Sequence, residues 1–592
     1  MTRIDPHSYF DDEQPRVRHL RLRWNLDFDR KEISGDVTLV FAEPCAGPLD
    51  LDSKGLTIRS VTLPDGTVVP HMLADEEPIL GQRLRLDLPA ATKEARISYC
   101  TSPDAIALQW LTPAQTEGKQ HPFLFSQCQA IHARSIIPLQ DSPRARVTYE
   151  AEVNVPAQLS AVMSAGPAGE KREGDRHTFL FSMPQPIPPY LLAIAAGNLA
   201  SRDVSSRVRV WAEPESVEDA AWEFGKTETM ITTAEALFGP YEWDRYDMLI
   251  LPPSFPYGGM ENPRITFLTP TVIAGDRSLV DVVAHELAHS WTGNLVTNAT
   301  MDHFWLNEGF TTWAERRILE ALHGEEVAIL GWAIGQNALD TSVERFGADS
   351  PLTRLRTDLE GIDPDDAFSS IPYEKGARFA VVLEREAGRE KFDRFMRAYM
   401  EHFRFTSITS EEFIGFLEEK MPGLAEKAKA TEWLYGTGMP DNAPVFRSAT
   451  LERLTKLAEG WAGGERPSDA DIENWDTREL LVYLQHLPRQ MDRESLDWLD
   501  QHFDLTSRGN YEILAEWLTI AAGSDYEPVF DRLREVLTRV GRMKYLRPLF
   551  LALGRHARTR KLAHEIFDAA KTSYHSLSRR VIEGVMEKYP AE

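Results

Sequence analysis

The strongest constraint on the fold is a change in hydrophobic periodicity along the chain. In residues 20–28 apolar and polar side chains alternate, and residues 84–88 and 147–155 repeat this pattern. Alternation of this kind places the apolar side chains on one face of a strand. We therefore predict an N-terminal antiparallel β-sheet domain over residues 1–200. Beyond residue 200, apolar residues recur increasingly at helical spacing, which predicts an α+β domain over residues 201–440.

The C-terminal third of the sequence predicts a helical domain. The segment "GMPDNAPVF" has two prolines and no periodicity, which predicts a linker at residues 441–449. After it, Asp476 and Glu479 have the spacing of a helix capping box, and apolar stripes follow at helical intervals. We predict a solenoid-like helical domain over residues 450–592.

Length and charge narrow the functional class. A chain of 592 residues is too long for one hydrophobic core, and a net charge of -26 argues against nucleic acid and anionic membranes as partners. No apolar run approaches the roughly twenty residues that span a bilayer, and the first residues lack a signal-peptide core. Three widely spaced cysteines fit reduced thiols. We therefore expect a cytoplasmic protein; the sequence does not indicate its oligomeric state, and a monomer is the simplest expectation.

The segment "VVAHELAHSW" points to a metal. On a helix, His285 and His289 project from the same face one turn apart, which suits two imidazole ligands of zinc. Glu286 lies about 100° further round, near the metal but free to act on a bound water. The alternative is an ordinary amphipathic helix that ends near Gly293, because HExxH also occurs by chance.

A third ligand is available downstream. Eighteen residues separate His289 from Glu308, which stands in the triplet "NEG" and is expected to precede a second helical segment. A catalytic zinc requires three protein ligands and one open position. With this joint spacing, the sequence resembles the gluzincin aminopeptidases. The resemblance implies a thermolysin-like catalytic domain with one Zn²⁺ per chain held by His285, His289 and Glu308, and with Glu286 as general base.

Two further segments match the same family. In "PYGGMENP", the paired glycines Gly258 and Gly259 indicate a backbone geometry closed to other residues. The resemblance implies that the segment of Gly258, Gly259 and Met260 pairs with the substrate backbone, while Glu261 binds the free amino terminus. In "SSIPYEKG", it implies that the Tyr373 hydroxyl faces the scissile carbonyl oxygen.

Several segments resemble the leukotriene A4 hydrolase branch of the family in particular, among them "FSQCQAIHARS" and "GRMKYLRPLF". This similarity implies that Gln129 assists in binding the amino terminus. It also implies that Asp365 lines an elongated pocket, and that Arg542 and Lys544 bind the carboxylate at the far end of a short peptide.

The chain departs from the branch pattern at two positions. Phe368 replaces a tyrosine near the expected lipid epoxide, and Phe310 replaces a histidine after the NEG triplet. We therefore predict a zinc metallo-aminopeptidase that acts on short peptides with a free N-terminus. The alternatives are a bifunctional aminopeptidase and lipid epoxide hydrolase, an endopeptidase, and an inactive binding scaffold. The sequence does not specify the preferred N-terminal residue.

Overall fold

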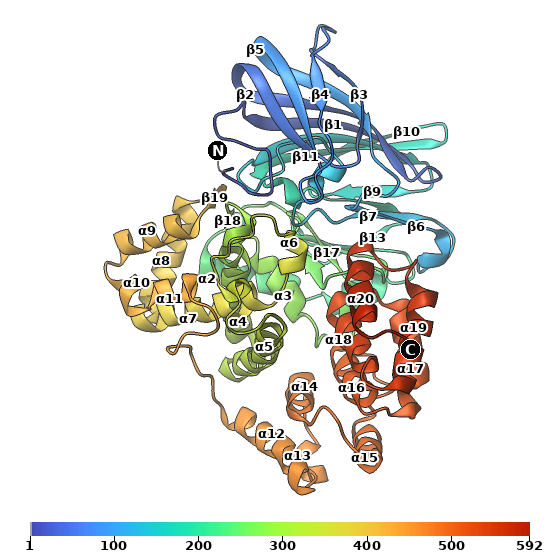
Figure 1. The fold of residues 1–592 in the computed structure, drawn as a ribbon, viewed down its shortest axis with the longest axis vertical. Coiled ribbons are helices and arrows are strands. Elements are labelled where there is room, and N and C mark those ends of the chain that lie inside the picture. Colours follow the sequence, from blue (N-terminus) through green and yellow to red (C-terminus); the bar gives the residue numbers. More distant parts are fainter. Residues whose placement is uncertain (1–2, 592) are drawn as a thin grey trace.

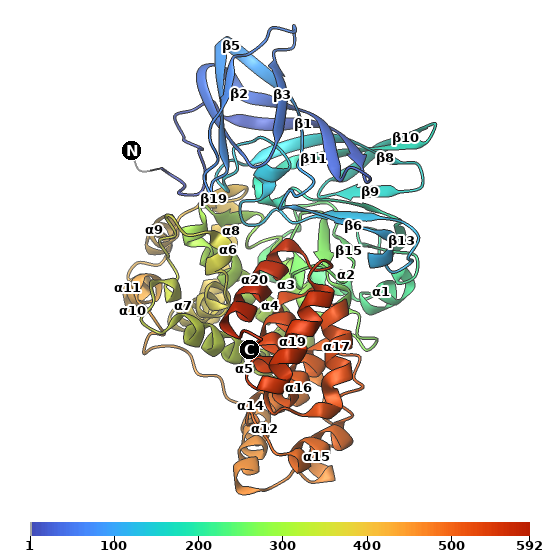
Figure 2. The same cartoon turned by 45° about the vertical axis from the view of Figure 1, so that its right-hand side comes forward.

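The computed structural model describes residues 3–591, which form a β-rich N-terminal part, a mixed central part and a helical C-terminal part (Figures 1 and 2). The N-terminal part holds an eight-stranded sheet with the strand order β10-β11-β8-β1-β2-β5-β3 and with β4 also paired to β5. Its strands are β1 (Val17–Asp27), β2 (Glu32–Ser53), β3 (Thr57–Thr62), β4 (His71–Leu73), β5 (Gln82–Cys100), β8 (Val147–Pro156), β10 (Gly166–Glu173) and β11 (Arg176–Ile187). A four-stranded sheet lies between it and the central part, with β6 (Leu108–Leu111), β7 (Phe123–Ser126), β12 (Ile194–Gly197) and β9 (Ser160–Met163).

The predicted alternation is confirmed in β1, where Leu20, Leu22, Trp24 and Leu26 are buried and the residues between them are mostly exposed. The pairing is antiparallel throughout these two sheets with one exception: β1 pairs with β8 in parallel. A parallel neighbour requires a long connection, and more than a hundred residues separate these two strands.

The central part contains a five-stranded sheet with the order β13-β14-β15-β17-β16. Its strands are β13 (Ala200–Asp203), β14 (Arg209–Ala212), β15 (Asp247–Ile250), β17 (Ile265–Leu268) and β16 (Gly259–Met260). Because β16 is the last strand in this order, one of its edges has no strand partner within residues 3–591. The remaining strands of this part are the parallel pair β18 (Val296–Asn298) and β19 (Thr406–Ile408).

Helices occupy the rest of the central part. They are α1 (Val217–Glu223), α2 (Thr227–Phe238), α3 (Asp281–Ala288), α4 (Trp305–His323), α5 (Glu325–Phe346), α6 (Pro364–Ala367), α7 (Gly376–Ala387), α8 (Arg389–His402), α9 (Ser410–Lys420), α10 (Leu424–Lys427) and α11 (Ala430–Tyr435), with one π-helical turn, η7 (Ile371–Lys375). Helix α3 packs against α4, and α4 against α7 and η7. This packing brings together the segments that the sequence singled out.

The C-terminal part is helical, as predicted. It contains α12 (Ala449–Glu459), α13 (Asp469–Ile472), α14 (Thr477–His486), α15 (Arg493–Phe503), α16 (Tyr511–Gly523), α17 (Phe530–Arg539), α18 (Met543–Leu553), α19 (Ala557–Ala570) and α20 (Ser576–Lys588). The capping box of Asp476 and Glu479 is present at the start of α14. Helices α14, α16, α18 and α20 pack in succession, and α17 packs on α19, so the helices form two layers.

Polar contacts join the three parts of the molecule. Arg146, from the N-terminal part, donates through Nη1 to the carbonyl of Asn294 at 2.8 Å and through Nη2 to that of Thr406 at 2.9 Å. From the C-terminal part, Arg478 binds Asp281 at the start of α3 through Nε at 3.1 Å and Nη2 at 2.5 Å. The contact with Arg478 fixes the start of helix α3, and the contacts of Arg146 tie the N-terminal part to the segment that follows α3 and to strand β19.

Candidate metal centre and substrate site

Two histidines and one glutamate converge between helices α3 and α4. The Nε2 atoms of His285 and His289 lie 3.2 Å apart, and Oε2 of Glu308 lies 3.3 Å from the first and 3.5 Å from the second. Ligands about 2.1 Å from a tetrahedral zinc lie about 3.4 Å from one another, so the three atoms have the separations of a zinc ligand set. Oε2 of Glu308 is also buried and has no hydrogen-bond partner among the described residues. A cation between the three atoms would stabilise this buried carboxylate oxygen, so the residues fit the metal.

Two local details differ from the sequence prediction. Helix α3 ends at Ala288, well before Gly293, and His289 is the capping residue with φ -53° and ψ -25°. Because these angles are still helical, the two imidazoles keep their one-turn separation. Glu308 does not precede the second helix but lies in the first turn of α4.

A carboxylate that sequence reasoning missed supports the first imidazole. Oε2 of Glu315 lies 3.0 Å from Nδ1 of His285, where it can accept the ring hydrogen, and Arg316 holds the other oxygen of Glu315 at 2.8 Å. A carboxylate behind a ligating histidine fixes the ring orientation and increases its basicity. Glu315 stands seven residues, about two helical turns, after Glu308, so the spacing could have identified it.

Glu286 lies beside this cluster and faces the edge strand. A Cβ atom added to Gly259 would come within 2.3 Å of Oε1 of Glu286. Burial raises the pKa of the Glu286 carboxyl to about 8, and the charge of a bound divalent cation would lower it again. The carboxylate is thus close to the metal ligands and to the strand on which a peptide could lie.

The sequence prediction attributed the glycine pair to a backbone geometry that other residues cannot adopt, and this reason is wrong. Neither Gly258 nor Gly259 has a positive φ, so their backbone is open to other residues. What excludes a side chain is space: a Cβ on Gly259 would meet Glu286, and one on Gly258 would come within 2.6 Å of Nη2 of Arg542. Gly259 and Met260 form strand β16 at the free edge of the sheet. An edge strand can pair with an extended peptide.

Glu261 follows this strand and is buried. Nε2 of Gln129 donates to Oε1 of Glu261 at 3.3 Å, and Nδ2 of Asn294 donates to the backbone carbonyl of Glu261 at 2.7 Å. Burial, with the charges of Glu308 and Glu286, raises the pKa of Glu261 well above its ordinary value. The site therefore concentrates negative charge that a substrate ammonium would stabilise. Asn294 was missed because its link to Glu261 exists only in the folded chain.

Tyr373 lies in the π-helical turn η7, and its ring stacks near that of His285 with centroids 6.0 Å apart. Burial, together with the charges of Glu308 and Glu261, raises the pKa of Tyr373 well above its ordinary value. The phenol is therefore protonated and can donate a hydrogen bond. Turns of π-helix are often found at functional sites.

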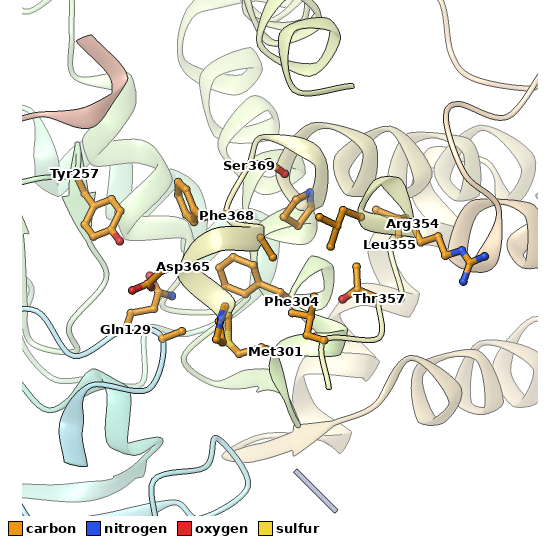
Figure 3. A pocket seen from close by; sticks show the side chains of 16 residues that line it. Gln129, Tyr257, Met301, Phe304, Arg354, Leu355, Thr357, Asp365, Phe368 and Ser369 are labelled. Atoms are coloured by element: carbon orange, nitrogen blue, oxygen red, sulfur yellow. The ribbon is translucent and has the colours of Figure 1, made fainter. Parts of the chain in front are cut away.

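An apolar pocket opens beside these groups. Gln129, Tyr257 and Asp365 lie together at one end of it, with Phe304 and Met301 in the middle and Leu355, Thr357 and Arg354 toward the other end (Figure 3). Its lining is Gln129, Ala130, Tyr257, Met301, Phe304, Leu352, Arg354, Leu355, Thr357, Leu359, Pro364, Asp365, Ala367, Phe368, Ser369 and Pro372.

Asp365 lines this pocket, with Oδ2 at 2.9 Å from Nε2 of His132, and its place in a substrate pocket stays a prediction. Burial alone would raise the pKa of the Asp365 carboxyl. The charge and hydrogen bond of His132 outweigh burial, so this pKa lies below its ordinary value. Phe368 also lines the pocket, with ring centroids 5.7 Å from Tyr257 and 6.1 Å from Tyr373. Phe310, in contrast, is fully buried against Trp305 in the core and does not line the pocket.

Arg542 and Lys544 reach the site from the C-terminal part. The backbone N–H groups of Gly541 and Met543 donate to the carbonyls of Pro253 and Pro256 at 2.7 and 2.9 Å. These bonds dock the segment against the residues that lead into strand β16. The Arg542 guanidinium therefore lies against Gly258, while Lys544 is more exposed.

Comparisons with known proteins agree with this geometry. The descriptions "Peptidase M1 N-terminal domain", "Peptidase family M1 domain" and "Leukotriene A4 hydrolase, C-terminal" match residues 13–191, 222–433 and 475–586. The chain is 38% identical over 607 residues to leucine aminopeptidase 2 of Yarrowia lipolytica, covering 98% of this chain and 93% of the relative. It is also 38% identical over 604 residues to leukotriene A-4 hydrolase of Xenopus laevis, covering 98% of both.

Among solved structures, yeast LTA4 hydrolase in complex with bestatin superposes with a TM-score of 0.90 at 32% identity, covering 98% of this chain and 97% of that one. The chain therefore belongs to peptidase family M1. It has the three-domain architecture of the leukotriene A4 hydrolase structures, as predicted, and it is a zinc metallo-aminopeptidase. The exact domain limits and the individual residue roles stay predictions.

Proposed function

We propose that this enzyme removes N-terminal residues from short peptides and that His285, His289 and Glu308 hold its zinc. The observation that carries the proposal is the set of three candidate ligand atoms separated by 3.2 to 3.5 Å, one of them a buried oxygen without a hydrogen-bond partner in the described part of the chain. A zinc ion held there would supply Lewis-acid polarisation and lower the pKa of water.

Glu286 and Tyr373 perform the proton chemistry in this proposal. Glu286 takes the proton of the attacking water and passes it to the departing amine. It is buried beside the proposed ligands and is outside the set of His285, His289 and Glu308, although with Glu261 and His289 it forms a second group close enough to hold a metal. The protonated Tyr373 donates to the carbonyl oxygen as negative charge develops on it.

The exopeptidase specificity comes from the buried carboxylate of Glu261. Glu261, with Gln129 beside it, binds the substrate ammonium, and the free edge of β16 aligns the peptide backbone. A blocked amino terminus would leave the buried carboxylate of Glu261 without a cationic partner, so the site discriminates against it. Arg542, which lies against Gly258 before strand β16, and Lys544 bind the carboxylate of a short peptide, while Asp365 lines the elongated pocket together with Gln129.

Glu286→Gln tests the proposal most directly. The variant keeps the shape of the side chain but cannot take a proton, so we expect zinc to stay bound at one per chain and hydrolysis of an aminoacyl anilide to fall by a factor of about 10² or more. Near-normal turnover by this variant would refute the role of Glu286. In the intact enzyme, an N-acetylated peptide should resist cleavage while its free form is hydrolysed; equal cleavage would indicate an endopeptidase.

A second candidate activity is hydrolysis of a lipid epoxide. The apolar pocket beside the metal centre favours it, and two relatives carry the name leukotriene A4 hydrolase. Phe368 argues against it, because this position offers no hydroxyl near the pocket. Incubation with an epoxide fatty acid decides between the two: hydrolysis above the uncatalysed rate that a zinc chelator abolishes would establish the second activity.

A reducing, cytosolic location is also part of the proposal. The support is that Cys45, Cys100 and Cys128 are all free thiols. In the described part of the chain, no helix has the length and apolar character needed to span a bilayer. Fractionation of cells that express the enzyme would test the location.

A further inference from the structure

A largely enclosed glutamate, with its side chain 12% exposed, connects Arg542, which lies against Gly258, with Lys544. Glu512, in the first turn of α16, accepts a hydrogen bond from Nη1 of Arg542 at 3.2 Å and from Nζ of Lys544 at 2.7 Å. The hydroxyl of Tyr545 donates to the same carboxylate at 2.9 Å and itself accepts from Arg542 at 2.6 Å. The two cations therefore already share one internal carboxylate.

Glu512 is ionised under all ordinary conditions. Burial alone would raise the pKa of its carboxyl, but Lys544 and Arg542 outweigh burial and hold it at about 2. The cluster of Arg542, Lys544 and Glu512 thus carries one net positive charge instead of two. Glu512 occupies Nη1 of Arg542, whereas Nε of Arg542 is buried and has no partner among the described residues.

The position of the cluster makes its charge relevant to substrate. Arg542 lies against Gly258, directly before strand β16, and its side chain is only 7% exposed. Lys544 is 56% exposed, so without Glu512 its ammonium could swing toward a ligand. A carboxylate that enters the cleft along β16 therefore competes with Glu512 for the same donors.

We infer that Glu512 is a specificity-determining residue that sets how strongly the enzyme prefers peptides with a free C-terminal carboxylate. It positions Arg542 and cancels one of the two positive charges, so the cleft attracts a substrate carboxylate with moderate strength and releases carboxylate products. This inference rests on the proposed role of Arg542 and Lys544. Sequence reasoning missed Glu512 because it stands thirty residues before Arg542 and only the folding of α16 against α18 joins them.

The experiment compares KM for a tripeptide acid with KM for the same tripeptide as its C-terminal amide. Their ratio, amide over acid, measures carboxylate preference. In Glu512→Gln we expect this ratio to rise about tenfold, as one unit charge about 6 Å from the substrate carboxylate would produce at an effective dielectric constant of about 40. The rise should shrink in high salt, because the effect is electrostatic.

Two control variants separate charge from structure. Glu512→Asp keeps the charge, so its ratio should stay near that of the unchanged enzyme. Glu516→Gln removes a charge one turn further along α16, where Glu516 pairs with Arg489 at 2.6 Å, and should leave the ratio unchanged. A thermal melt of each variant checks that it is folded.

Arg542→Ala distinguishes failure of this inference from failure of the proposed function. If Arg542→Ala abolishes carboxylate preference while Glu512→Gln leaves it unchanged or lowers it, Glu512 has only a structural role and the inference is overturned. If Arg542→Ala leaves the preference for a carboxylate intact, the carboxylate site is wrongly assigned. The proposed role of Arg542 and the inference about Glu512 then both fail. If the ratio of KM for the amide to KM for the acid rises in both Glu512→Gln and Glu512→Asp, the geometry of the side chain and not its charge is responsible. This outcome would also overturn the inference.

Discussion

Replacing Gly259 by alanine should disable catalysis without removing zinc. The added Cβ would lie 2.3 Å from Oε1, 2.5 Å from Cδ and 2.6 Å from Cγ of Glu286. Non-bonded carbon and oxygen atoms approach to about 3.4 Å, so the carboxylate must retreat by about 1 Å. No backbone strain adds to this, because φ of Gly259 is not positive.

A displacement of about 1 Å at a catalytic group costs a factor of about 10² in rate. We therefore expect kcat for an aminoacyl anilide to fall about hundredfold in Gly259→Ala. Zinc should stay at one per chain, because the atoms nearest to the added Cβ all belong to Glu286 and none to the three metal ligands. The assay is anilide release with metal content measured on the same preparation.

Gly415→Ala is the matched control. Gly415 is an exposed residue of helix α9 with nothing within 4 Å of an added Cβ, so the change should leave kcat unchanged and stabilise the fold by about 0.5–1 kcal/mol. If Gly259→Ala keeps kcat within threefold, contact with Gly259 does not position Glu286. If it loses zinc, the loss of rate arises at the metal and the reasoning is also wrong.

Three further outcomes are expected. Gly258→Ala pushes on Arg542, so it should raise KM for a peptide acid more than for the corresponding amide; equal effects on both would contradict the contact. Glu315→Gln removes the charge behind His285 and should weaken zinc binding about 10–100-fold in competition with a chelator, whereas unchanged affinity would exclude a supporting role. His303, whose pKa burial lowers to about 4, accepts a hydrogen bond at Nδ1 from the Ser410 N–H at 3.1 Å. Because the unfolded chain binds its proton at about 6.5, the folded state should lose up to about 3 kcal/mol as pH falls from 6.5 to 4. Urea unfolding at several pH values should show a flatter dependence in His303→Asn; an identical dependence would assign the loss to other groups.

The metal cluster could be predicted from sequence because its geometry is largely local. A one-turn separation of His285 and His289 follows from helix geometry alone, and one inter-helix contact then supplies Glu308. The alternation in β1 and the stripes of the C-terminal helices are likewise periodic signals, and burial confirms them. Their common feature is that each depends on neighbours within one or two turns or on a single strand.

What sequence could not predict depends on contacts between distant segments. The need for glycine at positions 258 and 259 is set by side chains from α3 and from the segment before α18, so the sequence suggested backbone freedom instead. The partners of Asp365 and Arg542, which are His132 and Glu512, come from other parts of the chain. Phe310 directly follows the NEG triplet but packs in the core. It lies two residues after Glu308 on helix α4, so its side chain points away from the side of the helix that carries Glu308.

The convergence of all three parts on one cleft has a consequence for biosynthesis. Gln129 and Arg542 stand more than four hundred residues apart, on either side of the metal-binding segments. During translation, a nascent chain can complete its zinc ligands long before α18 has emerged from the ribosome. Such an intermediate lacks Arg542 and Lys544, the cations that we propose to bind the substrate carboxylate. We therefore expect a chain truncated at the linker to hydrolyse peptide acids and peptide amides without preference, and the full-length chain to prefer peptide acids.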